Sequence, residues 1–169
     1  MEVKRIILAE NFGYTKQEID FLNSTVKNVE EDWFSIGFND IVLNLGEIPE
    51  NINFFDIISG KILVGRVKSN YEGLKDYITD CFNPAFYHED LYDLNVRIHP
   101  EQFIFRRETF KDFDSSFGKY FLHEYLYRAT EQMLPTYLAD SVIGYHGFTD
   151  LIPYDKVWYK KKMEEKYDS

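Results

Sequence analysis

The amino-acid sequence predicts a single α+β domain spanning residues 1–169, with a mostly antiparallel sheet, helices packed on one face and a helical C-terminal half. The first observation is length, because 169 residues suffice for one domain that buries its own core. The second is a hydrophobic content of 44%, which is typical of globular rather than disordered chains. The third is periodicity: alternating apolar segments dominate before residue 107, and helical spacing dominates after it.

The N-terminal part of the chain predicts a strand, a helix and two further strands. Val3–Ala9 is a short apolar strand, and a helix is expected to begin at Thr15, because Thr15 and Glu18 have the spacing of a capping box. Apolar residues then follow at helical spacing: Ile19, Leu22, Val26 and Val29. Residues 33–45 are rich in β-branched and aromatic side chains and are interrupted at Asn39–Asp40, which predicts two strands joined by a tight turn.

The middle of the chain predicts a strand, a helix and a hairpin. Lys61–Lys68 alternates as a strand does. Tyr71–Phe82 has apolar residues on one side at helical spacing and stops before Pro84, so a helix is expected there. Residues 94–107 alternate on both sides of a turn at His99-Pro100-Glu101, which is the pattern of a hairpin.

The C-terminal part of the chain predicts three helical pieces. Residues 117–133 carry two apolar stripes at helical spacing, and Pro135 kinks or divides this helix. A second piece around residues 138–143 is expected to stop at Gly144. Pro153 opens a last helix, whose polar tail, with the E-x-K sequence Glu164–Lys166, is expected to fray. The basic run Lys160–Lys162 is expected to form i,i+4 pairs with the acidic residues that follow it.

The charge of the chain limits the classes of partner. The formal net charge is -10, and the sequence has no long basic stripe. Because binding to a nucleic-acid backbone requires clustered Lys and Arg, direct DNA or RNA binding is disfavoured. A basic protein is the expected partner, since opposite charges promote association.

Cysteine usage and hydropathy indicate a cytoplasmic protein. Cys81 is the only cysteine, so the chain forms no internal disulfide. The apolar run Ile6–Ala9 is too short for the core of a signal peptide, and no segment has the length of a membrane span. Ile, Phe, Tyr and Asn are abundant while Ala is scarce, which is the residue usage of AT-rich codons and suggests a bacterial, phage or mobile-element source.

The common catalytic and cofactor motifs are absent. The sequence contains no G-x-G-x-x-G, no G-x-x-x-x-G-K-[ST] and no G-x-S-x-G. His123-Glu124 begins an H-E-x-x-H zinc motif, but Tyr127 stands where the second histidine is required. We therefore expect no metal and no cofactor, and we interpret His123 as a histidine on a helix surface beside a carboxylate.

Histidines offer the alternative of a small hydrolase or nuclease. A general base requires a histidine oriented by a carboxylate, which for His88 would be Glu89 or Asp90. His146 lies among glycines, where a ligand can approach the backbone closely. The alternative catalytic set is His88, His99, His123 and His146.

The aromatic content supplies the main functional hypothesis. Aromatic residues make up 18% of the chain, including 13 Tyr, more than one small core usually takes up. Tyrosines exposed among carboxylates are typical of protein-binding surfaces. The candidate partner-binding residues are Glu30, Glu31, Asp32, Tyr87, Glu89, Asp90, Tyr92, Asp93 and Tyr145.

The sequence thus favours a non-catalytic acidic binding protein of the inhibitor or immunity type. It would neutralise a basic partner, such as a toxin or a nucleic-acid-processing enzyme, by occlusion or by mimicry of nucleic acid. The alternatives are the histidine-based enzyme and a subunit of a larger assembly whose exposed aromatics form a permanent interface.

Overall fold

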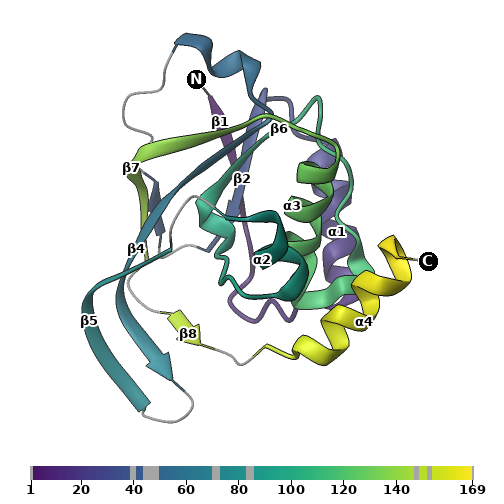
Figure 1. Ribbon diagram of the computed structural model, residues 1–169. Coiled ribbons are helices and arrows are strands. Elements are labelled where there is room, and N and C mark those ends of the chain that lie inside the picture. The colour runs from purple at the N-terminus through teal and green to yellow at the C-terminus, as the bar shows by residue number, and fades with distance from the viewer. Residues whose placement is uncertain are drawn as a thin grey trace.

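The computed structural model describes residues 2–38, 41–43, 50–69, 73–82, 86–146, 149–151 and 154–168. A mixed β-sheet forms one layer, and the α-helices form a second layer on one of its faces (Figure 1). The helices are α1 (Lys16–Lys27), α2 (His88–Asp93), α3 (Phe121–Glu131) and α4 (Lys156–Tyr167). Short 3-10 turns are η1 (Glu50–Phe54), η2 (Pro100–Gln102) and η3 (Ser115–Tyr120). The expected α+β class, with helices on one face, is confirmed.

The sheet combines parallel and antiparallel pairs. Its strands are β1 (Val3–Ile7), β2 (Trp33–Gly37), β3 (Ile41–Leu43), β4 (Ile57–Ser69), β5 (Gly73–Phe82), β6 (Phe103–Arg106), β7 (Thr136–His146) and β8 (Thr149–Leu151). The main order is β1-β2-β6-β4-β7-β3. The pairs β1–β2, β4–β7 and β4–β8 are parallel, whereas β2–β6, β3–β7, β4–β5 and β4–β6 are antiparallel. The expectation of a mostly antiparallel sheet is therefore corrected to a mixed sheet.

Strand β4 is the centre of the sheet and pairs along its whole length. One edge pairs with β6 over residues 57–59 and then with β5 over residues 62–69. The other edge pairs with β7 over residues 57–64 and then with β8 over residues 67–69. Because β4 carries neighbours on both edges, it is the strand that joins the two halves of the sheet.

The main core lies between the sheet and the helices. The capping box at Thr15 is present, since its hydroxyl accepts from the Glu18 amide and the Glu18 carboxylate accepts from the Thr15 amide. The apolar face of α1 that follows belongs to the same core as aromatic side chains of β2 and β6 such as Phe34 and Phe105. Phe105, Phe110, Phe113 and Tyr125 form a ring cluster with centroid distances from 4.9 to 6.0 Å. This cluster fixes α3 over the sheet.

A smaller core covers the opposite face of the sheet. Side chains alternate along a strand, so Trp33 and Ile104 point away from the helices that Phe34 and Phe105 contact. Ile52 of η1 packs on this second cluster, and the Arg106 guanidinium lies 4.4 Å from the centre of the Trp33 ring. Both faces of the central strands are therefore buried.

Three expected elements are replaced by strands or turns. Residues 73–82, expected to be helical, form β5 of the β4–β5 hairpin. The piece expected as a helix around residues 138–143 lies within β7, so the C-terminal half is only partly helical. Residues 94–99 form no strand, and only β6 of the expected hairpin at 94–107 is present. Cooperative strand pairing overrides local helical spacing in each of the first two cases.

Two other expectations also need correction. Strands β2 and β3 are not paired with each other, because β2 lies between β1 and β6 while β3 pairs with β7; the turn expected at Asn39–Asp40 falls outside the described residues. The tail expected to fray instead forms α4, which buries Tyr159 and Met163 completely. Lys162 lies over the rings of Phe117 and Trp158.

None of the helices in the described part of the chain is both long and apolar enough to cross a bilayer.

Candidate functional site

Helix α2 presents acidic side chains and a tyrosine at the surface of the helix layer. Tyr87, which directly precedes α2, is 78% exposed, and Glu89 and Asp93 are exposed as well. Leu91 is buried and anchors α2, and its carbonyl accepts a hydrogen bond from the Tyr159 hydroxyl at 2.8 Å. Within the part of the chain that the structure describes, the Glu89, Asp90 and Asp93 carboxylates have no cation or hydrogen-bond donor as a partner. Their charge is therefore available to another molecule.

His88 lies on the inner side of this surface and contacts the last turn of α3. Its ring stacks on Tyr127 with a centroid distance of 4.4 Å and an interplanar angle of 17°. Its Nε2 lies 2.7 Å from Glu131 Oε1. The carboxylate that orients His88 is therefore Glu131, and not the sequence neighbours Glu89 or Asp90.

Tyr92 connects α2 to the end of α4. Its hydroxyl donates a hydrogen bond to the Asp168 carboxylate. This hydrogen bond, together with burial, raises the pKa of Tyr92 above its ordinary value. Tyr92 was expected to bind a partner, but its polar group is used within the molecule, whereas the hydroxyl of the neighbouring Tyr87 lies on a largely exposed side chain.

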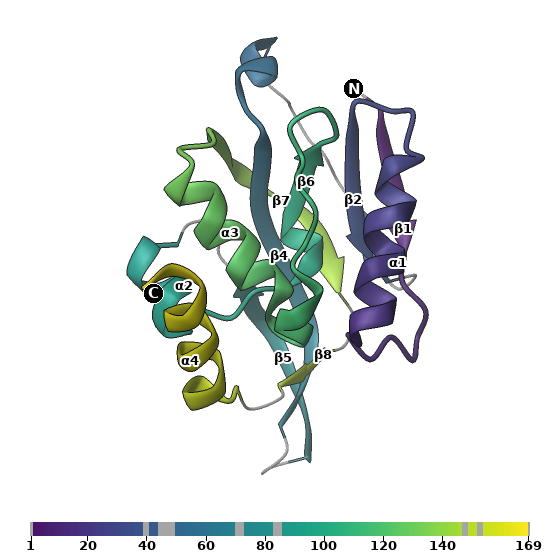
Figure 2. The ribbon, with the colours of Figure 1, turned by 90° about the vertical axis from the view of Figure 1, so that its right-hand side faces the viewer.

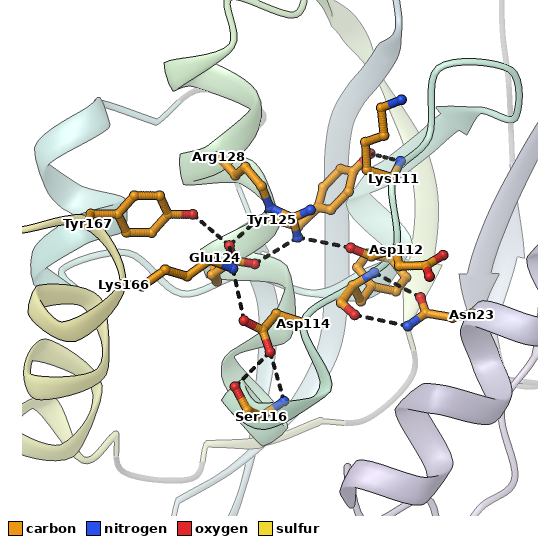
Figure 3. Close-up of polar contacts among 11 residues, drawn as sticks. Asn23, Lys111, Asp112, Asp114, Ser116, Glu124, Tyr125, Arg128, Lys166 and Tyr167 are labelled. Atoms are coloured by element: carbon orange, nitrogen blue, oxygen red, sulfur yellow. Dashed lines mark hydrogen bonds and ion pairs between the residues drawn. The ribbon is translucent and has the colours of Figure 1, made fainter. Parts of the chain in front are cut away.

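A buried carboxylate joins α3 to α4, as Figure 3 shows. Glu124 has no exposed side-chain surface. It accepts hydrogen bonds from Arg128 Nε at 3.0 Å and Nη2 at 2.9 Å, from Lys166 Nζ at 2.8 Å and from the Tyr167 hydroxyl at 2.7 Å. Because two cations and a phenol surround it, Glu124 remains hydrogen-bonded in spite of its burial. We call Glu124, Arg128, Lys166 and Tyr167 the Glu124 joint.

Asp114 extends the Glu124 joint to the turn before α3. Its carboxylate lies 2.8 Å from Lys166 Nζ and also accepts from the amide and hydroxyl of Ser116 (Figure 3). Burial acts to raise the pKa of Asp114, but the hydrogen bonds from Lys166 and Ser116 outweigh burial and hold the pKa at about 2. Burial and the hydrogen bond to Glu124 raise the pKa of Tyr167. These contacts have a structural role, since every group faces another group of the chain.

The other acidic candidates lie elsewhere. Glu30, Glu31 and Asp32 follow α1, and Figure 2 places α1 and α2 on opposite sides of α3. The backbone carbonyl of Glu31 accepts from Arg107 Nε at 3.2 Å, and that of Asp32 accepts from the Arg107 amide at 2.9 Å. The structure therefore does not bring the two acidic sets into one surface. Tyr145 and His146 belong to β7, and their side chains lie outside the described residues.

Two of the four candidate histidines are buried. His123 was expected on a helix surface, but only 2% of it is exposed, and its Nε2–H donates to the Val96 carbonyl at 3.0 Å. Burial lowers the pKa of His123 to about 4, so its ring is neutral at pH 7. His99 is buried too, and its Nδ1 accepts from the Glu101 amide at 3.2 Å as the cap of η2. Neither ring faces solvent, where a substrate would bind.

Sequence patterns gave no indication of a second buried ion pair, between Arg5 and Glu101. The two side chains come from strand β1 and turn η2, and Arg5 Nη1 lies 2.7 Å from Glu101 Oε2. Glu101 Oε1 also accepts from Arg5 Nη2 at 2.8 Å and from the Phe38 amide at 2.7 Å, while Arg5 Nη2 donates to the Phe38 carbonyl at 2.9 Å. The ion pair therefore binds both the backbone carbonyl and the backbone amide of Phe38, the residue that follows β2. No local pattern connects residues so far apart in the sequence.

Comparisons with known proteins do not assign the chain to a family. No family model matches the sequence, and no curated protein matches it significantly. Among the described residues, no group of three or more His, Cys, Asp or Glu side chains is placed to hold a metal ion. The candidate site is therefore the surface of α2, defined as Tyr87, Glu89, Asp90 and Asp93.

Proposed function

We propose that this chain is a non-catalytic, acidic binding protein that uses the α2 surface to bind and inhibit a basic partner protein. The observation that carries the proposal is the set of α2 carboxylates that have no partner among the described residues, beside a tyrosine that is 78% exposed. Uncompensated carboxylates attract cationic side chains, and an exposed tyrosine supplies apolar contact area with a polar tip. The carboxylates and the exposed tyrosine together suit a partner surface on which Lys or Arg side chains lie next to an apolar patch.

The mechanism of inhibition is occlusion aided by electrostatic attraction. The net charge of -10 creates a field that increases the rate of encounter with a basic protein. In the complex, the carboxylates of α2 pair with cationic side chains of the partner that would otherwise bind phosphate groups. A toxin or a nucleic-acid-processing enzyme has such positions, so either is the expected class of partner.

Affinity capture from the native host tests the proposal with two matched triple variants. In the first variant, Tyr87→Ala, Glu89→Gln and Asp93→Asn remove the α2 surface. In the second, Glu30→Gln, Glu31→Gln and Asp32→Asn remove three acidic residues beside α1, one more than the first variant removes from α2. We expect a basic protein that is retained by the wild-type chain and by the α1 variant but lost from the α2 variant. Equal retention by all three chains would reject the α2 surface as the binding site.

A hydrolytic enzyme is the second candidate, and the contact between His88 and Glu131 favours it. A histidine held by a carboxylate at 2.7 Å has the arrangement of a general base, and the His88 side chain is 40% exposed. Hydrolysis of generic ester, phosphodiester and nucleic-acid substrates, compared between wild type and His88→Gln, distinguishes the candidates. Activity that depends on His88 would replace the binding proposal. Capture of many copies of one large complex would instead support a subunit role.

A further inference from the structure

Two surface segments cover His123 and are bound to each other. Residues 95–98 and 154–158, which we call the cover, both contact the His123 ring. The Val96 carbonyl accepts from His123 Nε2, and the Tyr154 ring meets the imidazole edge-to-face at 5.2 Å. Lys156 Nζ donates to Asn95 Oδ1 at 2.6 Å, and the Arg97 guanidinium lies 4.6 Å from the centre of the Tyr154 ring. Because the segments contact each other, they can move as a unit.

The surroundings of His123 suit only the neutral imidazole. The ring faces Tyr120 of η3 at 6.2 Å, Tyr154 of the cover at 5.2 Å and Tyr159 of α4 at 6.2 Å. Arg97 of the cover is the charged group that acts on it, and its positive charge disfavours a second cation. The Nδ1 of His123 is buried and has no hydrogen-bond partner in the part of the chain that the structure describes. The adjacent carboxylate, Glu124, is already bound within the Glu124 joint.

We propose that the cover is acid-sensitive: protonation of His123 opens residues 95–98 and 154–158 together, while the sheet and the Glu124 joint remain folded. An imidazolium formed in place would have two N–H donors but one acceptor, and a guanidinium nearby. Opening gives the ring access to water. Because Arg97, Lys156 and Val157 on the cover are already exposed, the apolar contacts that opening breaks are mainly those of Val96, Ile98 and Tyr154 with the core.

The contact between Asp114 and Lys166 does not share this sensitivity over the same pH range. The lowered pKa of His123 means that the closed state binds its proton less readily than the open state, where the ordinary value is about 6.5. Acid therefore favours the open state progressively as the pH falls from about 6.5 towards 4. Asp114 keeps its charge, and its contact with Lys166, down to a pH near its pKa of about 2. The cover should open well before the C-terminal end of α4 is released.

Amide hydrogen exchange of the full chain, followed by mass spectrometry at pH 7.5 and pH 5.0, tests the proposal. After correction for the intrinsic exchange rate, we expect the opening constant of residues 95–98 and 154–158 to rise about 30-fold at pH 5.0. Amides of β2 and β6 should show no comparable rise. His123→Asn, which keeps an N–H donor but does not titrate, should lose the increase, whereas His88→Asn should keep it.

NMR titration of the wild-type histidine rings gives a second measurement that does not depend on how any variant folds. A His123 ring that titrates well below pH 6.5, with the cover amides more open at pH 5.0, supports the proposal. A His123 ring that titrates near pH 6.5 would overturn it. So would an unchanged pH response in His123→Asn, or a rise in exchange that is equal across β2, β6 and the cover.

Discussion

At the scale of single residues, Gly37 is the position where the fold tolerates no side chain. A Cβ built at Gly37 would lie 1.4 Å from Glu101 Oε1. That oxygen cannot move aside freely, since it is bound to Arg5 and to the Phe38 amide and the Glu101 side chain is fully buried. We expect Gly37→Ala to lower the free energy of unfolding by about 3 kcal/mol, because the methyl group must break a buried ion pair.

Urea denaturation measures this change, and Gly13→Ala provides the control. A Cβ at Gly13 would have its nearest contact at 3.4 Å, so that substitution should alter stability by less than about 0.5 kcal/mol. If both substitutions have the same small effect, the close approach of Glu101 to Gly37 is incorrect.

Met133 shows the opposite situation, in which a side chain stands where glycine fits better. Its φ is 57°, and the amides of Met133 and Leu134 bond back to the Thr130 and Ala129 carbonyls, which is the usual way a helix ends. A left-handed backbone costs a residue with a Cβ about 1–2 kcal/mol, part of which glycine loses again through unfolded-state entropy. We expect Met133→Gly to raise the free energy of unfolding by about 0.5–1 kcal/mol in urea denaturation.

Met133→Ala separates backbone strain from side-chain contacts. The methionine side chain is 85% exposed, so removing it while keeping the Cβ should change little. A gain from alanine as large as that from glycine would show that the exposed side chain, and not the left-handed backbone, is responsible.

At the scale of elements, Lys166 supplies one of the polar contacts that attach α4 to α3. Lys166 Nζ contacts both Glu124 and Asp114 at 2.8 Å. We expect Lys166→Met to lower the free energy of unfolding by about 1–3 kcal/mol, since hydrogen bonds to buried charged groups contribute in this range. The same substitution should raise the pKa of Asp114 from about 2 towards its ordinary value, which NMR titration measures.

Lys161→Met is the matched control on the same helix. Lys161 is exposed and has no ion pair or hydrogen bond within the described residues. Its replacement should leave both stability and the Asp114 pKa unchanged. Equal effects of the two substitutions would mean that Lys166 acts only through the total charge of α4.

The elements that could be predicted from sequence are those determined by neighbouring residues. The capping box at Thr15 and the apolar face after it specify α1 locally. The last helix was expected from Pro153, and α4 begins close to it, at Lys156, with Asp155 as its cap. Strands β5 and β7 could not be predicted, because the apolar residues of each also satisfy a helical period. What decides their conformation is pairing with β4, which joins residues such as Ile58 and Tyr137 that no local pattern relates.

At the scale of the whole molecule, the net charge of -10 predicts how binding responds to salt. Charge attraction between proteins is screened over about 8 Å at physiological ionic strength. We expect the association rate with the basic partner to fall about tenfold or more between 50 and 500 mM NaCl, with the dissociation rate changing much less. Surface plasmon resonance across a salt series measures both rates.

Substitutions on the α2 surface should also affect the association and dissociation rates differently. Glu89→Gln should slow association, whereas Tyr87→Ala should speed dissociation, because packed aromatic contacts act after the encounter. Rates that are indifferent both to salt and to these two substitutions would contradict electrostatic recognition by α2.

The candidate site could be predicted only in part, for a reason that concerns the whole chain. Tyr87, Glu89 and Asp93 are close in sequence, so their common exposure on α2 follows from one short helix. The partners of their neighbours come from distant elements: Glu131 contacts His88, and Asp168 binds Tyr92. Only the tertiary structure shows that Tyr87 is exposed whereas the Tyr92 hydroxyl is hydrogen-bonded to Asp168.

The Glu124 joint also has a consequence for the synthesis of the chain. Lys166 is translated 42 residues after Glu124, and Tyr167 follows it. At about 5–20 residues per second, Glu124 is synthesised some 2–8 s before these donors exist. During that interval Arg128, on the next turn of the same helix, is the cation that can neutralise it. A nascent chain that stops in this interval would therefore lack the two donors that α4 supplies to Glu124, and the surface of α3 that packs against α4 would stay uncovered.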